Sequence, residues 1–64
     1  MLKVIEVLAE SETSWEDAAQ KAIEKASTSV HGIKSIYIAN FEAKVEGNRI
    51  VTYRINAKIS FVLD

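Results

Sequence analysis

Tyr37 and Arg54 are the side chains in this sequence best suited to binding chemistry. They fall in two neighbouring segments with strand character, residues 33–41 and 51–64. We expect both on the open face of the sheet, with the guanidinium near the ring. Such a pair either forms part of a subunit interface or stacks on a flat ligand. The residues alone favour neither interpretation, because aromatic residues and arginine are also common at interfaces.

No catalytic set is predicted. His31 has no cysteine in the chain to activate, and Ser27 and Ser29 are only its neighbours in sequence. We expect His31 in the last turn of a helix, where a partly cationic ring suits the negative end of the helix dipole, so its role is capping or exposure to solvent. The sequence therefore points away from an enzyme.

The acidic residues around the predicted helix have two interpretations. They are Glu12, Glu16, Asp17 and Glu24. Interspersed with lysines, they favour a solvated helix face. A cation site assembled from several subunits is the alternative, although no loop in the sequence supplies the convergent oxygens that a hard cation needs. No set of metal ligands can be assigned from the sequence.

Two elements precede the hairpin that carries Tyr37 and Arg54. Residues 2–9 are mostly aliphatic and predict a strand shielded on both faces. Ser14 and Asp17 then resemble a capping box, and Gly32 is expected to end the helix that they begin. Trp15 is expected to anchor the start of this helix. The helix's apolar stripe, in which four of seven positions are alanine, consists of Trp15, Ala18, Ala19, Ala22, Ile23, Ala26 and Val30.

A hairpin follows the helix. Gly47 and Asn48 tolerate positive φ and predict its turn, and apolar and polar residues alternate along 51–64. In the segment before the turn, even-numbered residues should face the helix early and odd-numbered residues late, with a β-bulge near Asn40. Tyr37, together with Ile33, is then expected on the open face. The order of elements is βαββ.

The length and composition predict an oligomer. The chain has 64 residues and forms a single domain, 1–64. A domain of this size buries only about 60% of its unfolded surface. It has no cysteine and one histidine, so neither disulfides nor an evident metal site can supplement the core. Because its sheet is apolar on both faces and one helix covers one side, we expect other copies to cover the second.

Charge and hydropathy narrow the classes of partner. The net charge of −1 and the pI near 5.8 argue against nucleic acid. No apolar run approaches the roughly 18 residues of a membrane span, and the first residues do not resemble a signal peptide. We expect a cytoplasmic protein that binds neither nucleic acid nor membranes.

Several motifs resemble the dodecin family along essentially the whole chain. They are the helix start TSWEDAA, the strand entry GIKS, the hairpin VEGNRIV and the ending YR…FVLD. The resemblance implies an α+β fold in which a three-stranded antiparallel sheet half-wraps around one helix. It also implies a hollow homododecamer that binds flavin, riboflavin or FMN, by stacking the isoalloxazine ring between aromatic residues of facing subunits. No reaction on a substrate is implied.

The resemblance also assigns site residues. The tryptophan that stacks on flavin in the family falls on Tyr37, a polar residue touching the ring edge falls on Arg54, and a glutamine falls on Phe41. Tyrosine stacks with less area than indole, and phenylalanine cannot hydrogen-bond the ligand. Two alternatives therefore stand beside flavin: a calcium-type dodecin that binds metal ions between subunits, and a ligand-free scaffold in which Tyr37 and Phe41 lie in interfaces.

Overall fold

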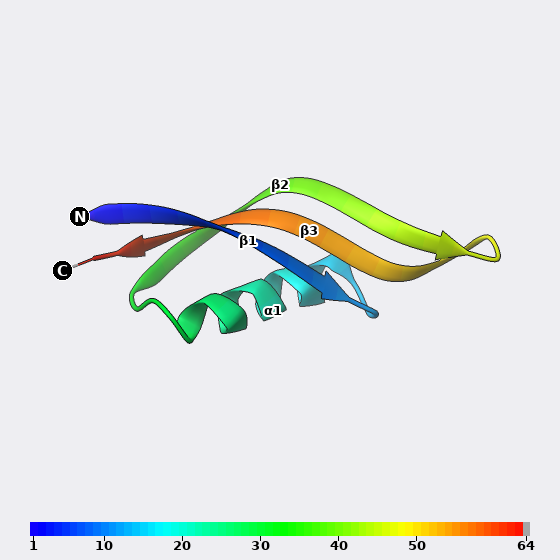
Figure 1. Ribbon diagram of the computed structural model, residues 1–64, viewed down its shortest axis with the longest axis horizontal. Helices are drawn as coiled ribbons and strands as arrows, with labels where there is room; N and C mark the ends of the chain where they lie inside the picture. Colours follow the sequence, from blue (N-terminus) through cyan, green and yellow to red (C-terminus); the bar gives the residue numbers. More distant parts are fainter. Residues whose placement is uncertain (64) are drawn as a thin grey trace.

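The computed structural model, described here for residues 1–63, has one helix on one face of a three-stranded sheet (Figure 1). The elements are β1 (Leu2–Ser11), α1 (Trp15–Ser27), β2 (Ile33–Glu46) and β3 (Arg49–Val62). The strand order is β1-β3-β2, and β3 is antiparallel to both neighbours. This arrangement confirms the predicted fold. Asp64, the last residue of the predicted third strand, lies outside the described residues.

Alanines on α1 let the helix pack closely on the sheet. Ala18 and Ala22 are completely buried and Ala26 nearly so, against a patch of β3 that includes Ala57 and Ile59. Methyl side chains at these helix positions let the helix backbone lie close to the side chains of β3. Ile59 is the only large side chain in the described residues that is fully buried. The core of the single subunit therefore contains few large apolar side chains.

A β-bulge in β2 redirects its side chains, as the sequence predicted. Ile36 and Ile38 pair with helix-facing residues of β3, and one extra residue follows before Asn40. Beyond it, Phe41 pairs with the buried Ile55, so odd-numbered residues now face the helix. The predicted bulge near Asn40 and the predicted change of face are both confirmed. Gly47 and Asn48 have positive φ, as expected of the turn.

Ile33 does not stand on the open face, and that expectation was wrong. It pairs with Phe61 and packs against the core. The cause is a second irregularity between Ile33 and Ser35, where one extra residue of β2 reverses the side-chain alternation. Tyr37 lies after this irregularity and keeps the predicted orientation.

The helix ends earlier than predicted. Its last residue is Ser27, and the hydroxyls of Ser27 and Thr28 donate to the carbonyl oxygens of Glu24 and Lys25. These bonds satisfy carbonyl groups that the helix would otherwise leave unpaired. His31 therefore lies beyond the helix, where it is exposed to solvent: of its two predicted roles, capping was wrong and exposure is confirmed. Gly32 does not end the helix but redirects the chain into β2 with φ +68°.

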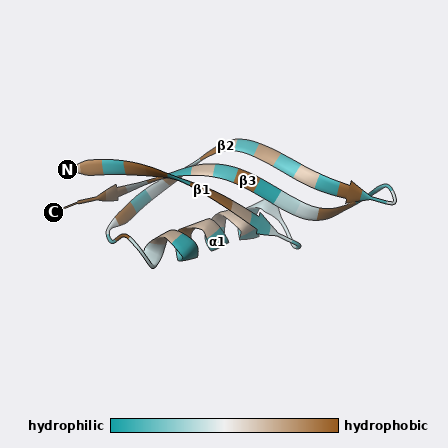
Figure 2. Cartoon of the chain, viewed as in Figure 1, coloured by the Kyte–Doolittle hydropathy of each residue, from teal (hydrophilic) through white to brown (hydrophobic). Residues whose placement is uncertain are grey.

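The sheet face opposite α1, called the outer face here, is open in the single subunit. Leu2, Val4 and Leu8 of β1 project from it and are exposed, so β1 is not shielded on both faces as expected. Figure 2 shows the hydrophobic residues recurring along β1 and β3. The chain ends lie side by side at one end of the sheet: the Met1 amino group donates to the carbonyl oxygen of Leu63, and the Leu63 amide donates to that of Met1.

Candidate functional site

Tyr37 is the exposed aromatic ring of the outer face. It is 67% exposed, and its direct neighbour across the β2–β3 ladder is Lys58. Directly opposed residues of an antiparallel pair project from the same face with their Cβ atoms about 5 Å apart. Tyr37 thus offers a free ring face beside a lysine, as part of a surface that could take a flat ligand or another protein.

Arg54 is held by two carboxylates on the same outer face. Its Nε donates to Glu10 at 2.6 Å, and its Nη1 donates to Glu42 at 3.5 Å. Glu10 lies across from it on β1 and Glu42 on β2. Hydrogen bonding and attraction to Glu10, with a smaller contribution from Glu42, raise the pKa of Arg54. Arg54 is therefore already occupied by partners within its own chain.

The structure does not bring Tyr37 and Arg54 together. Lys58, the neighbour of Tyr37, is four positions away from Arg54 on β3, a distance of about 13 Å along a strand. Both side chains share the outer face, as expected, but they are not in contact. A shallow hollow of about 710 Å³ is lined by Arg54, Glu10 and Glu42 among others, and not by Tyr37.

Phe41 lies on the opposite face of the sheet from Tyr37. Its ring meets that of Trp15 edge-on, with centroids 5.9 Å apart and an interplanar angle of 88°. Trp15 also packs edge-on against Tyr53 at 4.8 Å, and its Nε1 donates to the carbonyl oxygen of Glu42. These contacts confirm Trp15 as the anchor of the helix start. Within one subunit, Phe41 belongs to this aromatic cluster.

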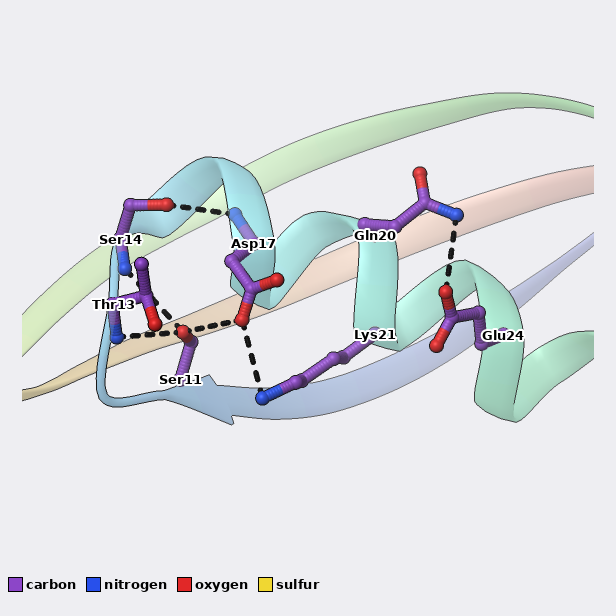
Figure 3. A network of polar contacts seen from close by, with 7 residues as sticks. All are labelled: Ser11, Thr13, Ser14, Asp17, Gln20, Lys21 and Glu24. Carbon is purple, nitrogen blue, oxygen red and sulfur yellow. Dashed lines mark hydrogen bonds and ion pairs between the residues drawn. The ribbon is translucent and has the colours of Figure 1, made fainter.

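The acidic residues near α1 organise the helix start. Asp17 accepts a hydrogen bond from Ser11 at 2.6 Å and forms an ion pair with Lys21, while its amide donates to the Ser14 hydroxyl (Figure 3). The bond from Ser11, and then Lys21, lower the pKa of Asp17. The predicted capping box is thus completed through Ser11, whose oxygen also accepts from the Ser14 amide.

The described residues contain no cluster of three or more potential metal ligands, so any cation site would need more than one copy of the chain. None of the helices described is long and apolar enough to cross a membrane.

Sequence reasoning missed Lys58 and the two carboxylates that hold Arg54. A signal for Lys58 was available, since counting outward residue by residue from the Gly47–Asn48 turn pairs Tyr37 with Lys58. The count holds because the bulge in β2 near Asn40 is offset by an irregularity between Lys44 and Val45. No comparable signal existed for Glu10, because the register of β1 on β3 depends on a long connection.

The fold and the outer face define a class of small βαββ proteins in which a curved sheet covers one helix. The dodecin family model matches residues 1–64. Calcium dodecin of Mycobacterium tuberculosis is 37% identical over 59 residues, covering 92% of this chain and 83% of that protein. This chain belongs to the dodecin family.

Solved structures agree with that assignment. The crystal structure of the calcium-chelating calcium dodecin from Mycobacterium tuberculosis is 34% identical, with a TM-score of 0.83 over 100% of this chain and 91% of that one. A dodecin from Streptomyces davaonensis is 19% identical, with a TM-score of 0.91 over 100% of this chain and 94% of that one. At that identity, the likeness shows the shared fold alone.

Proposed function

We propose that this protein assembles into a homododecameric shell and binds flavin, riboflavin or FMN, at the seams between its subunits. The observation that carries the proposal is the ring of Tyr37, which stands 67% exposed on an outer face that one subunit cannot cover. The protein holds its ligand, and no chemical step on a substrate is proposed.

Self-association follows from the exposed apolar surface. Leu2 and Leu8 are 64% and 66% exposed, whereas a soluble monomer rarely leaves a large contiguous apolar patch open. Asn56, beside Leu8 on the outer face, has a buried Oδ1 without a hydrogen-bond partner in the described residues. Both features are relieved if a second copy covers the face, because apolar area leaves water and a donor can reach the amide oxygen.

Flavin suits Tyr37 because both are flat. A ring stacked on tyrosine gains dispersion and loses apolar contact with water. Of the three residues assigned by resemblance, Tyr37 is the one best placed to stack. Arg54 keeps its predicted contact with the ring edge only through guanidinium hydrogens not engaged by Glu10 and Glu42. Phe41 would reach a ligand only from a neighbouring subunit, since its own subunit places it on the helix side.

Quenching of flavin fluorescence tests this proposal. Purified assembly should quench riboflavin and FMN on titration, and Tyr37→Ala should abolish quenching while gel filtration shows the assembly intact. Tyr37→Trp should tighten binding, because indole offers more stacking area. A gain of about 1 kcal/mol on each of two sides corresponds to roughly 30-fold in affinity. Quenching that survives Tyr37→Ala would place the ligand elsewhere.

Calcium is the second candidate, favoured by the similarity to the calcium dodecin. The described residues of one chain contain no cluster of three or more potential metal ligands. Carboxylates from several copies would therefore have to converge on the ion. In that case a calcium chelator should lower the melting temperature of the assembly, and added Ca²⁺ should restore it. If chelator and Ca²⁺ leave the melting temperature unchanged while flavin raises it, calcium is rejected as the ligand.

A further inference from the structure

Lys58 is the cationic residue placed next to Tyr37. The β2–β3 register sets the two residues directly opposite one another on the outer face, whereas Arg54 lies four residues further along β3. A lysine carries a compact charge on a flexible stem of four carbons, so it can follow an anionic group over several ångströms around its own position. The cation available to a ligand stacked on Tyr37 is therefore Lys58.

The charge of Lys58 is not neutralised by an ion pair within residues 1–63. Within residues 1–63, Lys21, Lys44 and Arg54 form ion pairs, but Lys58 forms none. Glu6 faces Lys58 from β1, and the two lie beyond ion-pair distance. Lys58 thus stands between Glu6 on one side and Tyr37 on the other.

Arg54 is less suited than Lys58 to binding an anion. Glu10 and Glu42 flank it, so this row of the sheet carries two negative charges against one positive charge. A phosphate brought to Arg54 would meet both carboxylates. The outer face therefore favours an anion beside Tyr37 and disfavours one beside Arg54.

We propose that Lys58 makes the Tyr37 site select the phosphorylated flavin, FMN, over riboflavin. This inference rests on the proposed flavin function. With the isoalloxazine ring on Tyr37, the ribityl chain can run across β3 and bring its phosphate to the Lys58 ammonium. The phosphate carries nearly two negative charges at neutral pH and accepts charge-assisted hydrogen bonds, whereas riboflavin ends in a neutral hydroxyl.

The size of the preference follows from the exposure of the pair. An ion pair in contact with water contributes only a modest binding free energy, which corresponds here to roughly two- to fivefold tighter binding of FMN than of riboflavin. Screening should reduce the ratio toward one as the salt concentration approaches about 1 M, where the Debye length falls to about 3 Å.

Parallel titrations of riboflavin and FMN test the assignment. The wild-type assembly should bind FMN more tightly, and Lys58→Gln should bind both flavins with equal affinity by weakening FMN alone. Glu6→Gln removes the competing carboxylate and should increase the preference for FMN. Arg49→Gln removes the same charge from an exposed position at the hairpin end of β3, away from Tyr37, and should leave the ratio unchanged. Gel filtration confirms that each variant remains assembled.

The outcomes separate this inference from the function on which it rests. Equal binding of both flavins by the wild type, or an unchanged ratio in Lys58→Gln, overturns the role of Lys58 and leaves flavin binding intact. Binding of neither flavin overturns both proposals. A ratio lost equally in Arg49→Gln attributes the preference to total charge and rejects Lys58 as its source.

Discussion

At the scale of single residues, side chains of the same charge differ in what they can bind, because their neighbours differ. Arg54 and Lys58 are both cations on one face of β3, but two carboxylates hold the first, whereas no carboxylate within residues 1–63 forms an ion pair with the second. The sequence predicted the face of Tyr37 correctly. It did not predict the partners of Arg54, because Glu10 reaches it only through the pairing of strands distant in sequence.

Asp17 gives a prediction about pH at this scale. Its pKa lies below the ordinary 3.8, because Ser11 donates to the carboxylate and Lys21 pairs with it. A carboxyl group with a lowered folded-state pKa stabilises the fold above its unfolded pKa, and that stabilisation is lost as the pH falls through the folded-state value. Melting temperatures should therefore drop in acid, and Asp17→Asn should show a smaller drop between pH 7 and pH 3.

Glu12→Gln is the matched control, since Glu12 lies just before α1, between β1 and the helix, and makes none of the hydrogen bonds or ion pairs described for Asp17. It should retain the acid sensitivity of the wild type. An Asp17→Asn variant that loses as much stability in acid as the wild type would assign the sensitivity to other carboxylates.

At the scale of elements, the sequence predicted the order and the central bulge because hydrophobic alternation reports directly which face is buried. Ile36 and Ile38 require one alternation and Ala43 the other, so an extra residue between them is forced. The end of α1 and the inward turn of Ile33 could not be predicted in the same way. They depend on hydrogen bonds from Ser27 and Thr28 and on a local irregularity without a hydrophobic signature.

Gly32 supports a prediction about the entry into β2. Its φ is +68°, and an added Cβ would lie 3.3 Å from the carbonyl oxygen of Val62. Gly32→Ala should therefore destabilise the protein by about 1–2 kcal/mol from the left-handed backbone, with a further loss from the close contact. Chemical denaturation at one fixed protein concentration measures this loss, because the apparent stability of an associating protein depends on its concentration.

Gly47→Ala provides the comparison. Gly47 has φ +58° with open space around its Cβ position, so only the backbone cost applies there. The variant at position 32 should be the less stable of the two. Equal losses would mean that Val62 moves aside without cost.

At the scale of the whole molecule, the outer face is the surface through which we propose that subunits associate. Size and composition predict association, but they do not predict which exposed strands would form the contact. Leu8 is 66% exposed and Val4 58%, so a charge placed at either should cost the isolated subunit little. A subunit of 7.1 kDa should elute as a particle of about twelve copies.

Leu8→Glu should shift that particle to smaller species on gel filtration, because the carboxylate would be buried in the seam without a partner. Ser29→Glu, at an exposed position after the helix, adds the same single negative charge and controls for a general effect of charge. A wild-type monomer at micromolar concentration, or an intact particle for Leu8→Glu, would contradict assembly through the outer face.

The two hydrogen bonds between Met1 and Leu63 hold the start of β1 beside the residue that follows β3. A short peptide could join them, and new ends could be opened at Gly47, in the tight turn at the far tip. Such a circular permutant would keep every strand in its present place. A passenger domain fused at the tip would then emerge opposite to one fused beside Met1 or Leu63, which gives two separate attachment points on each subunit.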